Sequence, residues 1–440
     1  MHNTRSRICL GKCDLRDNSV KSLHFPHRVP DDHSMSSHRP SPVSRIRLGI
    51  GATAVAATAI ATWGANATAL SLPGFGKPGA TATATPFTNG PVGFTRKAVG
   101  SLHVVGNKIL DASNSAMVLG GVHRTGYESA TGDNMGPAEA DSLATWASMV
   151  RIPVAGSLIS STCNNGGAAW LARLDNIVSQ VTSRNMIALI DYHSSAISGC
   201  GTPQHIPLPQ RAEARSFWQQ ISVRYANNPL VAFELYNEPH ANSTAQWVSG
   251  GAIVGSVLQG NYIGAGMQEL YDIVKGNTTN NLIFVEGNGF GGDETSVMSG
   301  ALHTVRARTV FAMHTYTCPR NKDLSCINDP KKRSFPTAPG TVGARWAPVS
   351  QVYPVVNTET GFPHPTGAVP PPGGQWFQSI ADWAINTSIH GGSQVGVIGF
   401  SDDGSWGGSD WALLDPAANW APNSSGAPLV NYMKTVQPAN

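Results

Sequence analysis

The sequence predicts an α/β protein folded as a (β/α)8 TIM barrel, with an N-terminal β-hairpin that closes the barrel floor. Eight short runs rich in Val, Ile, Leu and Phe recur after residue 95, and helix-like segments lie between them. Continuous apolar runs are typical of parallel strands buried on both faces, and eight alternations over about 300 residues fit one barrel. A doubly wound open sheet is the alternative, but no G-x-G-x-x-G motif follows the first strand.

The hairpin comes first in this scheme. In LHVVGNKILDASNSAMVLGGV, two strand-like pieces lie around Gly106-Asn107. The barrel strands are predicted at Met117–His123, Met149–Val154, Met186–Tyr192, Leu230–Tyr236, Asn281–Glu286, Thr309–His314, Val352–Thr358 and Gln394–Phe400. Amphipathic helices, with apolar residues at i, i+3 and i+4 on one face, are predicted at Trp170–Val181, Arg211–Tyr225, Tyr262–Val274 and Gln375–Ile385.

The composition points to a secreted protein and away from a polyanion-binding one. Only 13% of the residues are charged, against about 25% in an average soluble domain, and there are 47 Gly, 30 Pro and 11 Trp. The formal net charge of +3 comes from residues 1–47, which carry nine Lys or Arg and four Asp or Glu. The remaining residues carry 21 basic against 23 acidic side chains, so nucleic-acid binding as the main function is excluded.

The N-terminal region resembles a secretion signal followed by a linker. Residues 48–63 (LGIGATAVAATAIATW) are uncharged and apolar, follow Arg45 and Arg47, and precede small-x-small cleavage patterns. We therefore expect residues 1–69 to be an extension and signal, with Met35 a candidate for the true start. Retention of residues 48–63 as a membrane anchor is the alternative. Residues 70–94, rich in Pro, Gly, Thr and Ala, are predicted to be a linker, and residues 95–440 the catalytic domain.

Cysteine spacing agrees with export. Four of the six cysteines follow the signal, namely Cys163, Cys200, Cys318 and Cys326, and none has the short paired spacing of a zinc site. Three pairings are possible. We expect Cys163–Cys200 and Cys318–Cys326, because each pair would connect loops on one face of the barrel.

Polar residues gather where the predicted strands end. In a barrel, the C-terminal ends of the strands surround the active site. These ends supply Arg151, His193, Asn237, Glu238, Glu286, His314, Tyr316 and Glu359. Asp191 is expected to point the other way from His193 and to be structural. Each residue alone has an ordinary structural explanation, but polar residues at six strand ends indicate a site.

Two carboxylates at one cleft are the minimum equipment for cleaving a glycosidic bond. One protonates the leaving oxygen, and the other attacks the anomeric carbon or activates water. Arg151 would keep a nucleophilic carboxylate ionised, and Asn237 would bind a sugar hydroxyl. His314 and Tyr316 would orient the two acids.

These motifs resemble those of glycoside hydrolase family 5, the family of many cellulases and endoglucanases. Asn237-Glu238-Pro239-His240 is similar to the Asn-Glu-Pro signature of the family, and VRIPV, DYHSS, LYNEPH, LIFVEGN, MHTYT and NTETGF follow in the family's order. The resemblance runs from about Leu102 to the C-terminus. It implies a retaining double displacement without metal or cofactor, with Glu238 as acid/base and Glu359 as nucleophile, about 5–5.5 Å apart. It also implies that Arg151, His193, Asn237, His314 and Tyr316 are supporting residues and that Glu286 is not catalytic.

Two positions depart from the family pattern. The family usually has a Trp platform at the end of the eighth strand, where this chain has Phe400 and, six residues later, Trp406. Either Phe400 is a smaller platform or Trp406 reaches back. His123 ends the first strand where Asn is common among relatives, and is a candidate for sugar contact or for a structural role.

We therefore expect a secreted retaining β-glycosidase acting on a β-linked polysaccharide or oligosaccharide, with endo-β-1,4-glucanase (cellulase) activity as the leading hypothesis. The alternatives are the same mechanism on β-mannan, xyloglucan, β-1,3-glucan or a glycolipid, or a catalytically silent carbohydrate-binding wall protein. No metal, cofactor, nucleic acid or obligatory protein partner is expected, and nothing requires more than a monomer.

Overall fold

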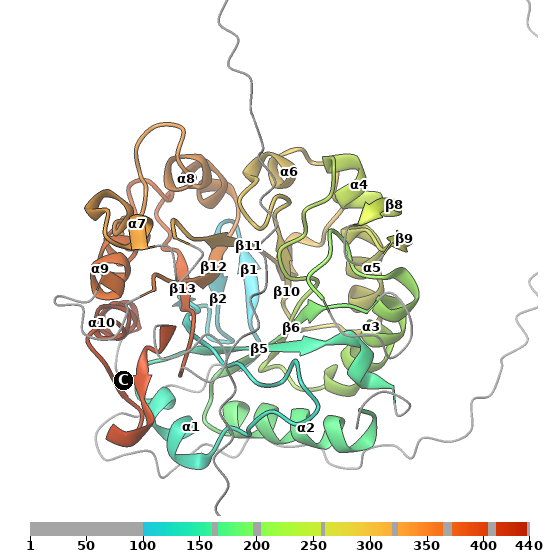
Figure 1. The fold of residues 1–440 in the computed structure, drawn as a ribbon, viewed down its shortest axis with the longest axis horizontal. Coiled ribbons are helices and arrows are strands. Elements are labelled where there is room, and N and C mark those ends of the chain that lie inside the picture. The colour runs from blue at the N-terminus through green and yellow to red at the C-terminus, as the bar shows by residue number, and fades with distance from the viewer. Residues whose placement is uncertain are drawn as a thin grey trace, which may run out of the picture. The chain divides into compact units, whose positions relative to one another are not determined.

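Eight parallel strands form a closed barrel, as predicted (Figure 1). The computed structural model describes residues 100–160, 166–196, 204–256, 260–318, 324–363, 372–403 and 411–437, all within one compact unit, Lys77–Asn440. Around the barrel the strands are β4 (Gly121–His123), β5 (Met149–Ala155), β6 (Ile187–Ser194), β7 (Val231–Glu234), β10 (Ile283–Glu286), β11 (Thr309–Thr315), β12 (Val355–Thr360) and β13 (Gly396–Gly399). β13 pairs with β4 and closes the barrel.

Helices cover the outside of the barrel. They are α1 (Pro137–Ala144), α2 (Ala168–Thr182), α3 (Arg211–Tyr225), α4 (Thr244–Ser249), α5 (Met267–Asn277), α6 (Glu294–Met298), α7 (Leu324–Ile327), α8 (Val342–Val352), α9 (Pro372–Ala384) and α10 (Ala427–Val436). Among the described residues, no helix has the length and apolar character needed to cross a membrane.

The predicted helix Tyr262–Val274 begins too early in the sequence. Residues 262–264 belong to β9 (Gly260–Gly264), which pairs antiparallel with β8 (Gly251–Ser256), and the helix α5 begins only at Met267. In this hairpin Tyr262 pairs with Ile253, and both side chains are buried. Tyr262 therefore belongs to a strand and not to the first turn of the helix. Gly264 and Gly266 end the strand pairing before the helix begins.

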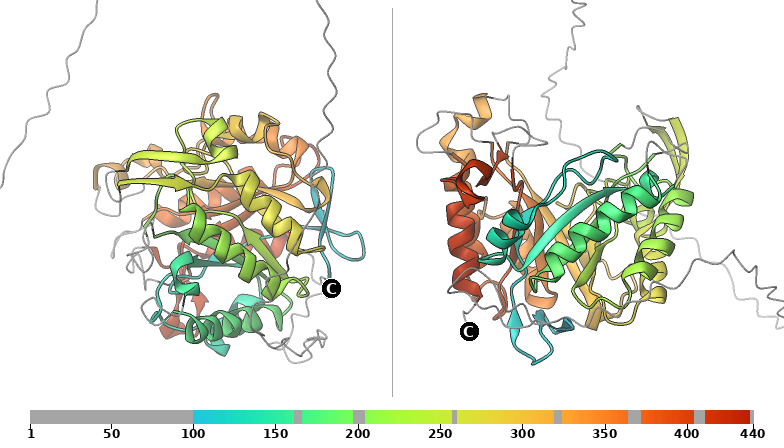
Figure 2. Two further views of the ribbon diagram at one scale, coloured as in Figure 1. Left: turned by 90° about the vertical axis from the view of Figure 1, so that its right-hand side faces the viewer. Right: turned by 90° about the horizontal axis from the view of Figure 1, so that it is seen from below.

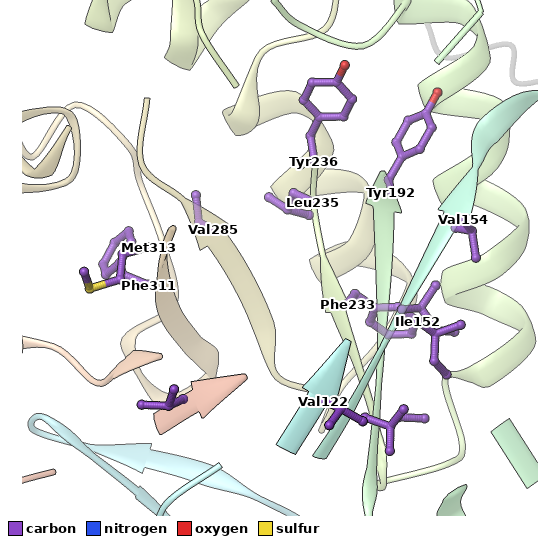
Figure 3. Packing of buried hydrophobic residues seen from close by; sticks show 14 of the residues in the cluster. Val122, Ile152, Val154, Tyr192, Phe233, Leu235, Tyr236, Val285, Phe311 and Met313 are labelled. Carbon is purple, nitrogen blue, oxygen red and sulfur yellow. The ribbon is translucent and has the colours of Figure 1, made fainter. Parts of the chain in front are cut away.

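The main core lies between the strands and the helices. Val122, Ile152, Val154, Tyr192 and Phe233 point out of the barrel wall toward the helical layer, where they are buried (Figure 3). Burying a side chain of this size contributes about 1.5–3 kcal/mol, so this interface is a main source of the stability of the scaffold. A rigid wall is what fixes the directions of the polar side chains at the strand ends.

The predicted hairpin closes the floor. β1 (His103–Val105) and β2 (Lys108–Leu110) pair antiparallel, and β3 (Ala116–Met117) adds a third strand. Its apolar residues Leu102, Val104 and Ile109 join a second buried cluster with inward-facing strand residues such as Met149 and Phe284. Figure 2 shows the hairpin, in blue, at one end of the barrel. β14 (Leu414–Asp415) and β15 (Ala421–Pro422) pair antiparallel and form a separate two-stranded sheet.

Candidate active site

The structure brings the predicted polar residues together at the carboxyl ends of the strands. Strand register places them side by side: His123 on β4 lies opposite Arg151 on β5, and His314 on β11 lies opposite Glu359 on β12. Hydrogen bonds and ion pairs then connect all seven residues predicted as catalytic or supporting, namely Arg151, His193, Asn237, Glu238, His314, Tyr316 and Glu359.

The Arg151 guanidinium lies at the centre of this set and is fully buried. Its Nε donates to Glu234 Oε2 at 2.6 Å, and its Nη1 donates to Glu359 Oε2 at 2.7 Å and to His123 Nδ1 at 2.8 Å. Burial alone would lower the pKa of Arg151, but the surrounding carboxylates raise it well above its ordinary value. Arg151 therefore provides a permanent positive charge beside Glu359.

The Nη2 group of Arg151 contacts two further residues, Asn237 and Asp191. It donates to Asn237 Oδ1 at 2.8 Å and lies 2.9 Å from Asp191 Oδ2. Because the Asn237 carbonyl oxygen is engaged, its NH2 group is directed away from the guanidinium. With these contacts every N–H group of Arg151 has an acceptor, so a lysine could not replace it.

The prediction that Asp191 points away from His193 is wrong. Residues two apart on a strand share a face, and Asp191 Oδ2 lies 2.7 Å from His193 Nδ1 inside the barrel. Burial alone would lower the pKa of His193, but the Asp191 carboxylate raises it to about 9. His193 therefore carries a positive charge at neutral pH and joins the site through Asp191.

Two hydrogen-bond donors contact the carboxyl group of Glu359, one at each oxygen. Arg151 Nη1 donates to Oε2, and the Tyr316 hydroxyl donates to Oε1 at 2.8 Å. Burial and the neighbouring Glu359 raise the pKa of Tyr316 well above its ordinary value, so its hydroxyl remains a donor. The ring of Tyr316 meets Trp411 edge-on at 5.8 Å, which limits its rotation. One donor on each oxygen therefore fixes the orientation of the Glu359 carboxyl group.

Glu238 follows β7 in a turn with an unusual backbone. Its φ is +47°, a left-handed conformation that is uncommon for a residue with a side chain. Its Oε1 lies 3.3 Å from His314 Nδ1 and its Oε2 lies 3.6 Å from His205 Nδ1. Burial raises the pKa of Glu238, but the bond to His314 and the nearby histidines lower it to about 2. The histidines around Glu238 therefore favour its ionised form when no substrate is bound.

The two carboxyl groups are close together. A carboxyl oxygen of Glu238, an imidazole nitrogen of His314 and a carboxyl oxygen of Glu359 all lie within 4.8 Å of one another. This places an oxygen of Glu238 within 4.8 Å of an oxygen of Glu359. Carboxyl oxygens this close to one another can contact the same small ligand.

His123 contacts Arg151 and Glu359, and Phe400 joins the site through the His123 ring. His123 is fully buried, and burial and Arg151 lower its pKa well below the ordinary value, so it is neutral. Its Nδ1 accepts from Arg151, and its ring contacts Phe400 at 5.0 Å between centroids. Phe400 also meets Trp411 edge-on at 5.6 Å. Trp406 lies outside the described residues, so the choice between Phe400 and Trp406 as the platform stays a prediction.

Three aromatic rings flank Glu238. His205 Nε2 and His240 Nδ1 contact the Glu238 carbonyl oxygen at 3.1 and 2.9 Å. The ring of Phe290 stacks on His240 at 4.2 Å with 9° between the planes, and Phe290 is 51% exposed. Phe290 has φ +59°, a conformation that is a genuine outlier for a bulky residue. An exposed ring held in this way beside Glu238 can contact a ligand.

A second buried ionic group supports the β13 end of the site. Arg124, just after β4, pairs with Glu139 at 2.6 Å and with Asp402 at 3.0 Å, and all three are buried. The Asp402 backbone N–H donates to the His123 carbonyl. These contacts fix the segment after Phe400 against the first strand.

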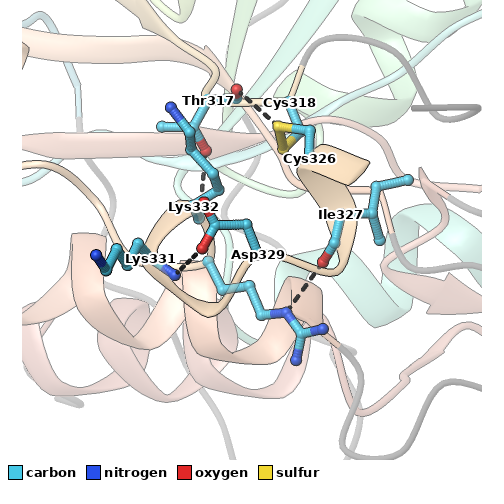
Figure 4. The surroundings of a disulfide bond; sticks show 8 residues. Thr317, Cys318, Cys326, Ile327, Asp329, Lys331 and Lys332 are labelled. Carbon is cyan, nitrogen blue, oxygen red and sulfur yellow. Dashed lines mark hydrogen bonds between the residues drawn. A yellow bond between two sulfur atoms is a disulfide. The ribbon is translucent and has the colours of Figure 1, made fainter. Parts of the chain in front are cut away.

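The disulfide prediction is confirmed for one pair. Cys318, after β11, and Cys326, in α7, are bonded, with 5.8 Å between their Cα atoms (Figure 4). The Thr317 hydroxyl donates to the Lys332 carbonyl and Arg333 Nε donates to the Ile327 carbonyl, so the loop is anchored at several points. Cys163 and Cys200 lie outside the described residues, as do the predicted signal and linker.

Three groups of side chains in the described residues have the spacing of a metal site. They are His123, His193 and Glu359; Glu234, Glu286 and His314; and Glu238, His314 and Glu359. Each group contains a residue bonded to the Arg151 guanidinium. The positive charge of Arg151, within hydrogen-bond distance of each group, repels a divalent cation. Arg151 itself neutralises part of the negative charge of these carboxylates.

Sequence reasoning missed Glu234 and gave Asp191 and Glu286 no role in the site. All three are charged residues on buried strands, and that mismatch was the available signal. His205, Phe290 and Trp411 come from loops, and nothing in their local sequence marks them.

Comparisons with known proteins agree on one family. The family model described as cellulase (glycosyl hydrolase family 5) matches residues 118–390. The manganese dependent endoglucanase Eg5A of Phanerodontia chrysosporium is 31% identical over 147 residues, which is 30% of this chain and 37% of that enzyme. Endoglucanase Z of Dickeya dadantii is 32% identical over 68 residues, 16% of this chain and 14% of that enzyme. The matched segments thus span well under half of these relatives.

Solved structures share the fold at low identity. The β-glucanase SdGluc5_26A of Saccharophagus degradans, solved with cellotetraose, has a TM-score of 0.53 at 18% identity, covering 79% of this chain and 98% of that one. The catalytic domain of the major endoglucanase of Xanthomonas campestris pv. campestris has a TM-score of 0.53 at 18% identity, covering 76% and 99%. A hyperthermophilic endocellulase of Pyrococcus horikoshii has a TM-score of 0.54 at 18% identity, covering 77% and 98%.

Proposed function

This chain belongs to glycosyl hydrolase family 5, and on that premise we propose that it is a secreted retaining β-glycosidase acting on β-linked glucan, with endo-β-1,4-glucanase activity as the leading assignment. The observation that carries the proposal is the pair of carboxyl groups of Glu238 and Glu359, with oxygens within 4.8 Å of one another. Secretion rests on the apolar segment at residues 48–63 and its flanking residues.

In the first step Glu359 attacks the anomeric carbon. Arg151 and the Tyr316 hydroxyl hold the Glu359 carboxylate in position, so the attack needs little rearrangement. Glu238, as acid, protonates the glycosidic oxygen while the carbon–oxygen bond breaks. A glycosyl–Glu359 ester and a shortened glucan chain with a free hydroxyl result.

In the second step Glu238 acts as base. It takes a proton from a water molecule, which attacks the anomeric carbon and releases Glu359. Two inversions give net retention. The Asn237 NH2 group, turned away from Arg151, suits a hydrogen bond to the sugar 2-hydroxyl near the nucleophile.

Aromatic residues support a sugar substrate on the leaving-group side. Glu238 must face the leaving oxygen, so the rings beside Glu238 flank the leaving sugar. Phe290, exposed and stacked on His240, offers a flat apolar face there. Relatives solved with cellotetraose or described as endoglucanases make a β-glucan the first substrate to test.

The test is reducing-sugar release by the purified protein from carboxymethylcellulose, barley β-glucan, xyloglucan, galactomannan and laminarin, with Glu359→Ala as the blank. Activity on the first two that is absent from the blank supports the endoglucanase assignment. Release from galactomannan, xyloglucan or laminarin alone replaces the substrate and keeps the mechanism. No release by a folded protein from any of these polysaccharides would overturn the assignment.

A further inference from the structure

The peptide group that follows Glu238 has a single hydrogen-bonding atom. Pro239 comes next in the chain and has no N–H, so only the carbonyl oxygen of Glu238 can form a hydrogen bond there. A residue before proline is also pushed towards an extended backbone, whereas Glu238 has φ +47°, in the left-handed region. The conformation of Glu238 therefore needs support from surrounding groups.

Two imidazole groups contact this carbonyl oxygen. His240 Nδ1 lies 2.9 Å from it and His205 Nε2 lies 3.1 Å from it. A carbonyl oxygen only accepts, and its two lone pairs allow two bonds at once, so both nitrogens carry a hydrogen and donate it. His240 comes from the turn after β7, and His205 comes from the segment between β6 and α3. Two separate parts of the chain thus meet at one backbone oxygen.

Packing keeps both rings in this orientation. The ring of His240 stacks on Phe290 at 4.2 Å with 9° between the planes. The ring of His205 meets His240 at 5.1 Å and Phe290 at 5.9 Å, each at 65°. The His240 backbone N–H donates to the Pro207 carbonyl at 3.0 Å, which connects the turn to the segment that carries His205. Neither donor can rotate away from the carbonyl oxygen without breaking these contacts.

The peptide group before Glu238 is fixed as well. Glu286 is fully buried, and its Oε2 accepts the Glu238 N–H at 2.7 Å. The Phe290 N–H donates to the Pro239 carbonyl at 3.1 Å, which fixes the next residue of the turn. With its N–H bonded on one side and its carbonyl oxygen bonded on the other, Glu238 has both flanking peptide groups in place. Together they determine the direction of its Cα–Cβ bond.

We propose that His205 and His240 are positioning residues of the acid/base, which together bond the Glu238 carbonyl oxygen and so direct the Glu238 carboxyl group at the leaving oxygen. The inference rests on the proposed function, because it takes Glu238 as the acid. Neither histidine needs to touch the substrate or to exchange a proton. Each acts through the backbone of Glu238, so its loss should matter only in steps in which Glu238 transfers a proton.

The shared oxygen predicts how the two histidines combine. In the described part of the chain, no other group donates to the Glu238 carbonyl oxygen. When one imidazole is lost, the other still bonds the oxygen. When both are lost, the peptide group has no bond at its only polar atom. Loss of both donors should therefore cost more than the product of the two single losses.

The test uses matched substitutions at both positions. His205→Phe and His240→Phe remove one donor each and keep a planar ring to pack against Phe290. In His205→Gln and His240→Asn, the side-chain NH2 group can replace the lost Nε2–H or Nδ1–H donor. kcat/KM is measured on a β-glucan oligosaccharide and on an aryl glycoside whose leaving group needs no acid.

His390→Asn is the control. His390 is a buried histidine whose Nε2 also contacts a backbone carbonyl, that of Trp383, at 2.9 Å. It lies between α9 and the start of β13, at the opposite end of that strand from the site. The control should lower the thermal stability and leave kcat/KM on both substrates close to the wild-type values.

On the oligosaccharide each single Phe variant should lower kcat/KM about fivefold, and the double Phe variant at least about 100-fold. On the aryl glycoside all three should stay within about twofold of wild type, because its glycosylation step needs no acid. His205→Gln and His240→Asn should recover most of the loss. Equal losses on both substrates, as a structural role alone would give, or a double variant no worse than the product of the single ones, would overturn the proposal.

The hydrogen positions on the two rings test the geometry without substrate. At about pH 8.5 an ordinary imidazole is neutral, and long-range ¹H–¹⁵N NMR spectra distinguish an Nδ1–H ring from an Nε2–H ring. We expect the Nε2–H form for His205 and the Nδ1–H form for His240, with the signals assigned by their absence from the Phe variants. The opposite form in either ring would overturn the proposal. If both forms are as expected but the wild type hydrolyses no β-glucan, the proposed function fails and the contacts to the carbonyl oxygen stand.

Discussion

Removing the Tyr316 hydroxyl probes how the nucleophile is held. Tyr316→Phe deletes the O–H group that donates to Glu359 Oε1 at 2.8 Å and leaves the ring in place. The ring still packs edge-on to Trp411, so the cavity created is no larger than one oxygen. The bond from Arg151 to Oε2 is untouched. Glu359 therefore loses one of two donors that orient it.

The expected loss follows from the kind of bond removed. A hydrogen bond to a charged group contributes about 1.5–3 kcal/mol. If most of this is realised as the carboxylate attacks, kcat/KM should fall about 10- to 150-fold. The loss should appear with good and poor leaving groups alike, because both require nucleophilic attack.

The assay compares Tyr316→Phe with a matched control. Tyr271→Phe removes another buried tyrosine hydroxyl, which contacts Thr309 Oγ1 at 2.9 Å and accepts the Val305 N–H at 2.8 Å. Thr309 is the first residue of β11, at the opposite end of the strand from the site. The control should lower thermal stability and leave kcat/KM nearly unchanged. Equal kcat/KM in wild type and Tyr316→Phe would refute the assigned role of the hydroxyl.

Three further predictions concern other parts of the barrel. Glu238→Ala should spare the glycosylation step for aryl glycosides with good leaving groups, since they need no acid, and abolish it for glucan; equal loss on both would contradict the acid assignment. Phe290→Ala should raise KM about three- to tenfold on glucan oligosaccharides but not on aryl glycosides, which have no leaving sugar; a change in neither would exclude the platform. Burial raises the pKa of Glu213 to about 7, against an ordinary value of 4.5. The folded state therefore holds a proton that the unfolded chain releases, so wild-type stability should decrease between about pH 4.5 and 7, by up to about 3 kcal/mol. Melting of Glu213→Gln across this range should show a smaller decrease, and an identical profile would assign the pH dependence elsewhere.

The barrel could be predicted because its strands carry a strong local signal. Runs such as Met149–Val154 are buried on both faces, and only parallel strands covered by helices need that pattern. Once the strands are located, the site follows from topology, because parallel strands direct their carboxyl ends to the same end of the barrel. Glu359 lies near the end of β12, and Arg151, the third residue of β5, joins it because it lies opposite His123 at the end of β4.

The supporting contacts could not be predicted with the same rules. Glu286 was interpreted as non-catalytic from the resemblance, and its contact with the Glu238 backbone depends on a turn geometry that no local pattern encodes. Asp191 was placed on the wrong face although strand period alone puts it beside His193. The hairpin β8–β9 was missed because Tyr262 also fits the helical period of the segment that follows.

The most direct test of the account is to trap the glycosyl–enzyme intermediate. The protein is incubated with a 2-deoxy-2-fluoro cello-oligosaccharide carrying a good leaving group, and the labelled peptide is identified by mass spectrometry. The fluorine slows both steps, and the leaving group restores only the first, so a retaining enzyme accumulates the ester. The account predicts one sugar, bound to Glu359, and none in Glu359→Ala. A label on Glu238 or Glu286, or none in an enzyme that hydrolyses glucan, would contradict it.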